Sequence, residues 1–394
     1  MSTKHSFGKV LLALFAATTP NAACEGSLRV TPSPDAAVEG GVGAVAQGAS
    51  GGRCGTSPKQ LVDLQALAAQ TNAVGISAGT PLAVDATSLY FVMGYTLMAV
   101  PIGGGSLSTL GSLPDADSRL SQDIQPYVTS TNVVLHYLPA NSDNEQIASV
   151  PIQGGTPTVL TTSSGRIVGF AVSGSNIYFV DDAGAQTISV GGGAVSVLSS
   201  QVASTATGLG VAGPQLVVTE QDGTVVGIPV DGGSPTTLAT QQSSASFPQA
   251  CGADVCWWTG AAPNAMVSDG PGAIARLGED GGLTTIPGAP SFPWALAFDG
   301  VSFFEAVGCD VCPGTIVRVP LTGTPATMTS GGFVAVDDQC AYFTTIQEYP
   351  LTDGGSSEGI FSVSKASSSC CDASGGTCVY SAGACPLTVD SGAD

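Results

Sequence analysis

Cysteine is the residue type in this sequence that is best able to do chemistry. The 394 residues include 11 cysteines, too many for a reducing compartment unless they bind metal or react. Cys309 and Cys312 have the Cys-x-x-Cys spacing of zinc and redox sites, but no histidine lies close to them in the sequence. The residues around them predict strands, whereas a redox cysteine is expected at a helix N-terminus. We therefore expect a disulfide that closes a hairpin.

A second local disulfide is predicted between Cys251 and Cys256, which bracket a turn. Cys24 stands apart near the N-terminus, and the other ten cysteines allow five disulfides. Six of these have no local partner: Cys54, Cys340, Cys370, Cys371, Cys378 and Cys385. Six cysteines allow fifteen pairings. We expect at least one bridge from the C-terminal segment to Cys54 or Cys340, which would clasp the two ends of the fold together.

Acid–base chemistry has few candidates. The sequence has two histidines, His5 near the N-terminus and His136 in a stretch that predicts a strand, where we expect a structural role. Asp85, Asp299 and Asp337 each follow a short apolar stretch at the same place in a repeated unit. An aspartate at the start of a turn accepts hydrogen bonds from nearby backbone N–H groups. We therefore interpret these residues as structural and predict no metal, no cofactor and no catalytic residue.

The tryptophans are the remaining residues of interest. Trp257 and Trp258 are adjacent, so on a strand they face opposite sides, and we expect one of them in the core. Trp294 lies at the start of a repeated unit. It is the best candidate for an aromatic side chain that faces a ligand.

The elements that position these residues follow from a repeated phrase. Residues 100–105 read Val-Pro-Ile-Gly-Gly-Gly, with Leu110 five residues later, and close copies begin at Val150 and Ile228. An apolar run precedes each copy and recurs every 39–46 residues, the period of a four-stranded propeller blade. The first residues of these runs are Leu89, Val133, Ile177, Leu216, Val255, Val301 and Ala341. We predict an all-β fold, a seven-bladed propeller of four-stranded antiparallel blades.

The seventh unit lacks a fourth-strand phrase, and an open sheet edge invites pairing with another chain. Residues 59–64, just before the first unit, are the candidate donor of the missing strand. A helix is the alternative there, because Ser57 could cap it and Pro58 suits its first position. We favour the strand, since the ring of blades must close.

Composition excludes some classes of function. The chain has 53 glycines and 25 prolines, only 10% charged residues and a formal charge of −20. Many short strands joined by tight turns give this profile. Such an acidic surface repels phosphate, so we expect no nucleic-acid partner.

The N-terminus predicts export. Lys4 and Lys9 precede a short apolar stretch, residues 10–17, as in a signal peptide of residues 1–23. Ala22-Ala23-Cys24 resembles the end of a bacterial lipobox, which implies acylation of Cys24; plain secretion with Cys24 as a half-cystine is the alternative. Residues 24–58 are rich in Gly, Ala and Pro and suit a flexible tether. Residues 59–366 form the propeller, and residues 367–394 a Cys-rich C-terminal segment.

The repeated phrases resemble those of secreted bacterial β-propeller lipoproteins of the broad YWTD/NHL/TolB-like group, over residues 59–366. The Tyr-Trp-Thr-Asp core of that group is reduced here to Tyr-Phe-Val at residues 90–92 and 178–180, so no functional residue is carried over. The resemblance implies a monomeric, extracytoplasmic binding or scaffold protein with a protein, glycan or small-ligand partner, and contact with the membrane only through a lipid anchor. The alternative is a propeller lyase or hydrolase that acts in the central channel.

Overall fold

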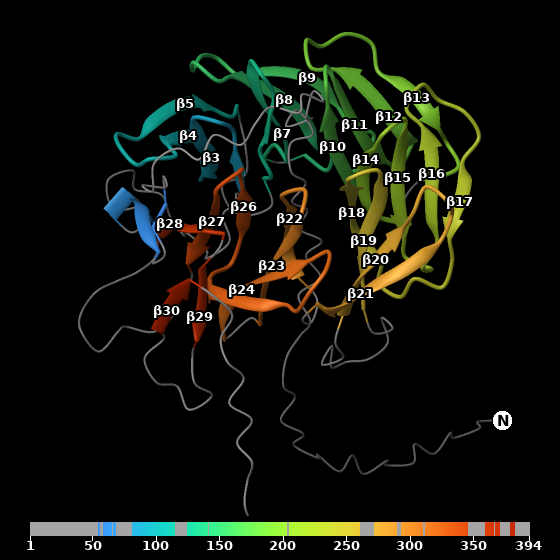
Figure 1. The fold of residues 1–394 in the computed structure, drawn as a ribbon. Helices are drawn as coiled ribbons and strands as arrows, with labels where there is room; N and C mark the ends of the chain where they lie inside the picture. Colours follow the sequence, from blue (N-terminus) through green and yellow to red (C-terminus); the bar gives the residue numbers. More distant parts are fainter. Residues whose placement is uncertain are drawn as a thin grey trace, which may run out of the picture.

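A computed structural model describes residues 54–55, 58–64, 66–67, 81–114, 124–140, 142–202, 205–260, 272–289, 293–309, 312–345, 359–365, 367–370 and 379–382. Within them the chain forms seven four-stranded antiparallel sheets, which stand as blades around a ring (Figure 1). The predicted seven-bladed propeller is confirmed. None of the described residues belongs to a helix that is both long and apolar enough to cross a bilayer.

The first four blades each use four strands that follow one another in the chain. Blade one contains β2 (Leu82–Val84), β3 (Ser88–Met93), β4 (Thr96–Pro101) and β5 (Ser108–Ser112). Blade two contains β6 (Tyr127–Val128), β7 (Asn132–Tyr137), β8 (Gln146–Pro151) and β9 (Thr158–Thr162). Blade three contains β10 (Gly169–Ser173), β11 (Asn176–Asp181), β12 (Gly184–Ser189) and β13 (Ser196–Ser199). Blade four contains β14 (Ala206–Ala212), β15 (Gln215–Glu220), β16 (Val225–Pro229) and β17 (Thr236–Ala239).

Blades five and six repeat this plan, and blade seven departs from it. Blade five contains β18 (Ser246–Cys251), β19 (Asp254–Thr259), β20 (Gly272–Leu277) and β21 (Leu283–Ala289). Blade six contains β22 (Pro293–Phe298), β23 (Ser302–Cys309), β24 (Cys312–Pro320) and β25 (Ala326–Ser330). Blade seven contains β26 (Val334–Val336), β27 (Cys340–Thr345), β28 (Gly359–Ser364) and, from the other end of the chain, β1 (Lys59–Asp63).

Each blade buries both of its faces against neighbours, because successive residues of a strand point to opposite sides. In blade one, Leu89 and Phe91 belong to an apolar cluster shared with blade seven. Tyr90 and Val92 belong to the cluster shared with blade two. All four side chains are buried. The interfaces between neighbouring blades, here called seams, are therefore the hydrophobic core of the protein.

The register of blade six corrects one alignment made from the sequence. Phe298 pairs with Phe303 as Val84 pairs with Leu89 in blade one. Phe303, and not Val301, is thus the equivalent of Leu89. Val301 lies in the preceding turn and is 67% exposed.

The repeated glycines and leucines meet across the seams. Gly155 of blade two donates its backbone N–H to the carbonyl oxygen of Leu110 of blade one at 2.8 Å. Gly233 of blade four makes the same contact with Leu198 of blade three at 3.4 Å. Gly155 has a φ of +153°, in the region that favours glycine. The repeated phrase therefore supplies a docking contact between neighbouring blades in addition to a turn.

Strand β1 closes the ring, as predicted, and the helical alternative is wrong for residues 59–63. It pairs antiparallel with β28, from Lys59 opposite Ser362 to Asp63 opposite Gly359, and in Figure 1 the blue strand lies beside β28. Leu61 lies against Gly104 of blade one, close enough that a Cβ atom on this glycine would be 3.7 Å from Leu61 Cδ2. It thus takes the place of the repeated leucine, because Leu160 of blade two lies in the same way against Gly192 of blade three. Blade one therefore docks on β1 as blades two, three and four dock on the repeated leucines of their predecessors.

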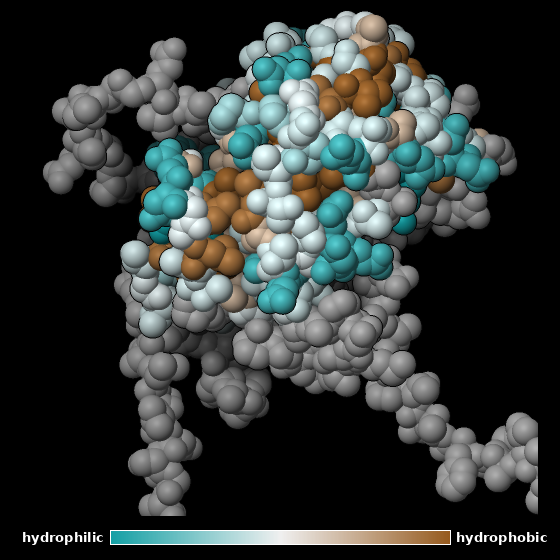
Figure 2. Space-filling model, turned by 90° about the vertical axis from the view of Figure 1, so that its right-hand side faces the viewer, coloured by the Kyte–Doolittle hydropathy of each residue, from teal (hydrophilic) through white to brown (hydrophobic). Residues whose placement is uncertain are grey.

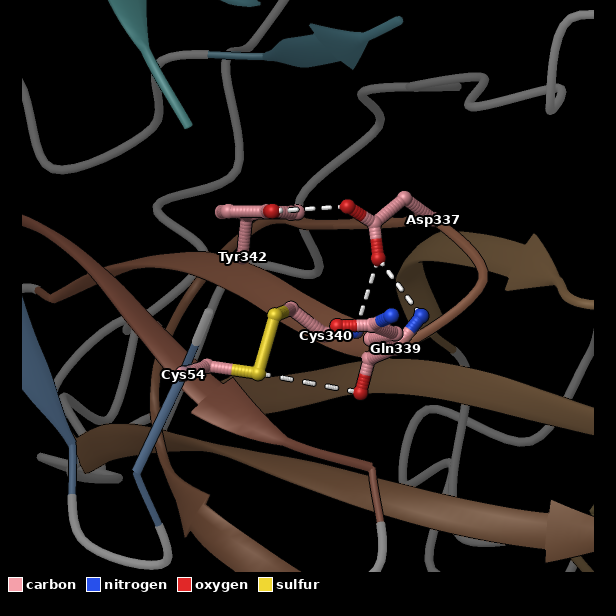
Figure 3. The surroundings of a disulfide bond; sticks show 5 residues. All are labelled: Cys54, Asp337, Gln339, Cys340 and Tyr342. Atoms are coloured by element: carbon pink, nitrogen blue, oxygen red, sulfur yellow. Dashed lines mark hydrogen bonds between the residues drawn. A yellow bond between two sulfur atoms is a disulfide. The ribbon is translucent and has the colours of Figure 1, made fainter. Parts of the chain in front are cut away.

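A disulfide between Cys54 and Cys340 fixes this closure (Figure 3), with the two Cα atoms 6.0 Å apart. Next to it, Ser364 donates its backbone N–H to the carbonyl oxygen of Gly55 at 2.9 Å. The expected bridge from the C-terminal segment to Cys54 or Cys340 is wrong, because these two cysteines bond to each other and a sulfur forms only one such bond. β1 brings Cys54 to the start of β27 without help from the C-terminal segment.

The C-terminal segment forms a two-stranded sheet of β29 (Ser367–Cys370) and β30 (Val379–Ala382), and β29 lies against β25 of blade six. Cys371, Cys378 and Cys385 lie outside the described residues, and the side chain of Cys370 is not described. Their pairing stays a prediction.

The repeated aspartates hold the turns between the first two strands of a blade. Asp337 Oδ1 accepts the backbone N–H groups of Gln339 and Cys340 at 2.8 and 2.7 Å (Figure 3). Asp85 makes the equivalent bonds with residues 87 and 88, and Asp299 with residues 301 and 302. The predicted structural role is confirmed.

The second oxygen of each aspartate also has a partner. Asp85 Oδ2 accepts the Tyr90 hydroxyl at 2.7 Å and Asp337 Oδ2 the Tyr342 hydroxyl at 2.8 Å. Asp299 Oδ2 is 2.6 Å from Lys365 Nζ. Burial raises the pKa of Asp85, but hydrogen bonds from Thr87, Tyr90 and Ser88 outweigh it and lower the pKa below its usual value.

Removal of the two described disulfides should have unequal effects. The Cys54–Cys340 bridge spans 286 residues and the Cys251–Cys256 bridge spans 5. Loop entropy in the unfolded chain gives about 5 kcal/mol for the first and about 2 kcal/mol for the second. The double Cys→Ala variants, compared by chemical denaturation, should show this order. Equal losses of unfolding free energy would mean that the long bridge does not hold the ring closed.

Replacement of a turn aspartate should destabilise the ring. Asp337→Ala removes the acceptor of two backbone N–H groups and the Tyr342 hydroxyl, so we expect the free energy of unfolding to fall by about 2 kcal/mol. Tyr342→Phe, which breaks only the last bond, should cost about 1 kcal/mol. Asp231→Ala removes an exposed charge from a turn of the same face in blade four and should change stability by under about 0.5 kcal/mol. A loss in Asp231→Ala as large as in Asp337→Ala would contradict this role.

Candidate functional site

The two faces of the ring are built differently. The turn face carries the links between strands one and two and between strands three and four of the blades. The connection face carries the links between strands two and three and between successive blades. On the turn face, the links between strands one and two are short in all seven blades, from residues 174–175 in blade three to residues 85–87 in blade one. In blades one, six and seven these links share the aspartate hydrogen-bonding scheme described above.

The links on the connection face are unequal. Between strands two and three they range from residues 182–183 in blade three to residues 346–358 in blade seven. Between blades they range from residues 331–333, which join blades six and seven, to residues 64–81, which join β1 of blade seven to blade one. Loops that vary in length while a rigid scaffold holds their ends are where binding residues commonly lie. The connection face is therefore the candidate functional site.

His136 lies near this face in β7. Its Nδ1 is 2.6 Å from Glu145 Oε2, and its ring packs at a tilt against Phe170 of blade three with the ring centroids 5.0 Å apart. Ser163 donates its hydroxyl to the backbone carbonyl oxygen of Glu145 at 2.9 Å. His136 thus links the second and third blades. Glu145, nine residues away, could have been found from the hairpin register, because residues 136 and 147 pair across the two strands.

Asp181 is the most buried carboxylate of this region, at 1% exposure. Its Oδ2 accepts the backbone N–H of Ser164 at 2.9 Å, and its Oδ1 accepts that of Ala183 at 2.8 Å and the side-chain amide of Gln186. Both oxygens serve the link between blades two and three and the turn after β11. Asp181 stabilises these loops and, with its oxygens so engaged, is a poor ligand for an ion.

Glu220 and Asp222 occupy the corresponding link of blade four. Burial, and then the neighbouring charge of Asp222, raise the pKa of Glu220 above its usual value. The backbone N–H of Thr224 lowers the pKa of Asp222. The acidic groups of the connection face thus differ in environment from blade to blade, unlike the aspartates of the turn face.

Catalytic or metal-binding sets are not assembled in the described part of the chain. There, no three His, Cys, Asp or Glu side chains are grouped so that they could hold a metal ion. Two segments fit the Gly-x-Ser-x-Gly pattern of hydrolases, residues 75–79 and 355–359. Of these ten residues the structure describes Gly359 alone, which is the first residue of β28. That motif requires a turn from a strand into a helix, a setting that a blade of antiparallel strands does not provide.

The tryptophans lie in different seams. Trp257 and Trp258 point to opposite sides of β19, as expected, but both are buried, and not only one. Trp257 packs toward blade four and donates its Nε1–H to Gln242 Oε1 at 3.2 Å. Trp258 packs toward blade six. Trp294 lies in β22 at a register shift, and since its side chain is not described, its contact with a ligand stays a prediction.

The local disulfide predictions have separate outcomes. Cys251 and Cys256 are bonded, with Cα atoms 5.8 Å apart, as predicted. Cys309 and Cys312 pair across the hairpin between β23 and β24. Their side chains are not described, so the disulfide between them stays a prediction.

Comparison with known proteins bears on the fold. No protein-family model matches the sequence, and a search of curated proteins finds no match. Among solved structures, YCF48 bound to D1 peptide is 10% identical with a TM-score of 0.51, over 78% of this chain and 96% of that chain. The WD40 β-propeller domain of Doa1 is 11% identical with a TM-score of 0.50, over 71% and 88%. Similarity at this level establishes architecture and no residue's role. The chain is a seven-bladed β-propeller.

Proposed function

We propose that this protein is a non-catalytic, extracytoplasmic propeller that binds a protein partner on its connection face, held at the cell surface by a lipid on Cys24. The observation that supports binding there is the contrast between the faces. Seven blades share short turns on one side, while loops of unequal length cover the other. A rigid ring with one variable face is suited to recognition.

Two further observations support the proposal. The Cys54–Cys340 and Cys251–Cys256 disulfides are of a kind that persists in oxidising compartments. The solved propeller YCF48 is bound to D1 peptide, which supports a protein or peptide partner for a chain of similar fold. No observation in the described residues favours the alternative of a lyase or hydrolase, since His136 contacts Glu145 and Phe170 and no nucleophile.

A crosslinking experiment tests which face binds. Tyr95, 51% exposed in a link of the connection face, and Val301, 67% exposed in a turn of the opposite face, form a matched pair. A photo-crosslinking amino acid at each position, activated in intact cells, should give a discrete crosslinked protein from position 95 and none from position 301. Gel shifts and mass spectrometry detect the product.

The crosslink should also respond to the surface around it. Substitution of Asn144, on the same face in blade two, should lower the yield of crosslinked protein from position 95. Substitution of Gln339, on the turn face, should leave this yield unchanged. Products from position 301 alone would move the site to the turn face. Equal products from both positions, or none from either, would contradict a binding function of the connection face.

The anchor is tested separately. Cys24→Ser removes the thiol that a lipid would occupy, so the protein should leave the detergent-rich phase on Triton X-114 partition and appear in the medium or periplasm. Mass spectrometry of the mature N-terminus should show an acylated Cys24 in the unmodified chain. An unacylated N-terminus, with Cys24→Ser distributed as the unmodified protein, would establish plain secretion and leave the binding proposal intact.

A further inference from the structure

One seam differs from the others at a position that alignment of the blades makes visible. In each of the other six blades, the third residue of the apolar run in the second strand is apolar. These residues are Phe91, Leu135, Phe179, Val218, Trp257 and Phe343. All are fully or almost fully buried. Blade six carries Glu305 there, between Leu296 and Val317 of the adjoining strands.

Glu305 is buried in the seam between blades five and six. The neighbours on its side of β23 are Phe303 and Val307, which belong to the apolar cluster that includes Trp258 of blade five. Glu305 has 0% exposure, and neither carboxyl oxygen has a hydrogen-bond partner among the described residues. Burial raises the pKa of Glu305 from 4.5 to about 8.

Blade five presents a second unusual residue to the same seam. Gln249 of β18 stands opposite Cys256, where the first strands of blades three, six and seven carry Ala171, Ala297 and Ala335. Each of these alanines packs in one apolar cluster with a residue of the next blade. That residue is the equivalent of Glu305 in its own blade. Gln249 is 4% exposed, and both atoms of its amide lack described partners. By the repeat geometry, Gln249 and Glu305 therefore occupy facing positions.

The charged groups on this seam do not neutralise Glu305. On the blade-five side they are Asp254 of β19 and Arg276 of β20, which pair with each other at 2.5 Å. The two cysteines there, Cys251 and Cys256, form a disulfide and do not titrate. On the blade-six side Arg318 of β24 is opposite Phe304, which faces blade seven. An ionised Glu305 would thus lack a cation among the described groups of its seam, so its neutral form is favoured.

The backbone that enters blade five is strained. Gln241, Ser244 and Phe247 have φ of +60°, +50° and +53°, and they are the non-glycine residues with positive φ in the described chain. Phe247 packs in the cluster that borders Glu305. Strain of this kind persists only where surrounding structure enforces it, so loosening of this seam would let the segment relax.

We propose that Glu305 is a proton-dependent latch, which holds blades five and six together while it is protonated and releases their seam when it ionises. The neutral carboxylic acid tolerates an apolar seam and can share a hydrogen with the facing Gln249 amide or with a trapped water. The carboxylate cannot remain there unpaired, and water must reach it through the seam. The ring would open at one defined place, far along the chain from the β1 closure.

The direction of the pH effect follows from linkage. Between pH 4.5 and about 8 the folded ring retains a proton on Glu305 that the unfolded chain has lost. Stability is therefore full below this window and decreases as the pH rises through it. The effect is opposite to that of a salt-bridged carboxylate, which loses stability on acidification.

The test compares melting temperatures of the mature full-length protein between pH 5 and pH 9. The unmodified protein should lose roughly 5 °C or more relative to Glu305→Gln, which imitates the protonated acid. Glu279→Gln removes an exposed charge from the same region and should keep the pH dependence of the unmodified protein. Glu305→Leu restores the residue type of blade two and gives a second pH-insensitive variant should Glu305→Gln fold poorly.

Limited proteolysis locates the opening. At pH 9 the unmodified protein should be cut within residues 240–300 faster than at pH 6, and Glu305→Gln should not. The proposal is wrong if Glu305→Gln and Glu305→Leu retain the pH dependence, or if cleavage rises equally in all seams. It is also wrong if Ca²⁺ or Na⁺ raises the melting temperature of the unmodified protein at pH 9 but not that of Glu305→Gln, because Glu305 would then bind a cation as a carboxylate.

Discussion

The structure depends on one constraint: a four-stranded blade of this protein is apolar on both faces and can bury them only between two neighbours. Leu89 and Phe91 face one way and Tyr90 and Val92 the other, and all four are buried. No blade has a core of its own, so the ring is stable only when every seam is filled. The last seam is the critical one, because it joins residues from opposite ends of the chain. β1 and the Cys54–Cys340 disulfide act there together.

The same constraint assigns the surfaces their roles. Packing in the seams restricts the strands to residues that fill the space between two blades. The links on the connection face need only join the ends of the strands, so their length and sequence can vary. The outer strands are less constrained than the inner strands and more constrained than the links. They pair within a blade, yet Val159 of β9 and Val197 of β13 are exposed. Figure 2, seen from the side of β13 and β17, shows apolar patches separated by polar side chains. On this side of the ring the blade edges are thus exposed without one continuous apolar surface, which limits edge-to-edge aggregation there.

Much of the fold could be predicted because each blade repeats the same physical solution. The Val-Pro-x-x-Gly-Gly phrase reflects a turn whose glycines dock on the preceding blade, and the requirement for closure pointed to residues 59–63. The partner of Cys54 could not be predicted with the same success. Sequence order places Cys340 near the C-terminal cysteines, but in the closed ring Cys54, next to β1, is its partner. Long-range pairing depends on the ring as a whole, which no local pattern contains.

Glu305 shows why the remaining detail escaped. With Val301 taken as the equivalent of Leu89, the next inward-facing residue is Phe303, and blade six looks like every other blade. The true register moves the alignment by two residues and puts a carboxyl in a position that is otherwise apolar. A buried acid without a partner opposes the interaction that the whole ring depends on. The other six blades carry apolar residues at the position of Glu305, so an apolar residue would suit blade six as well. We therefore attribute the acid to the pH-dependent opening of its seam, which an apolar side chain could not provide.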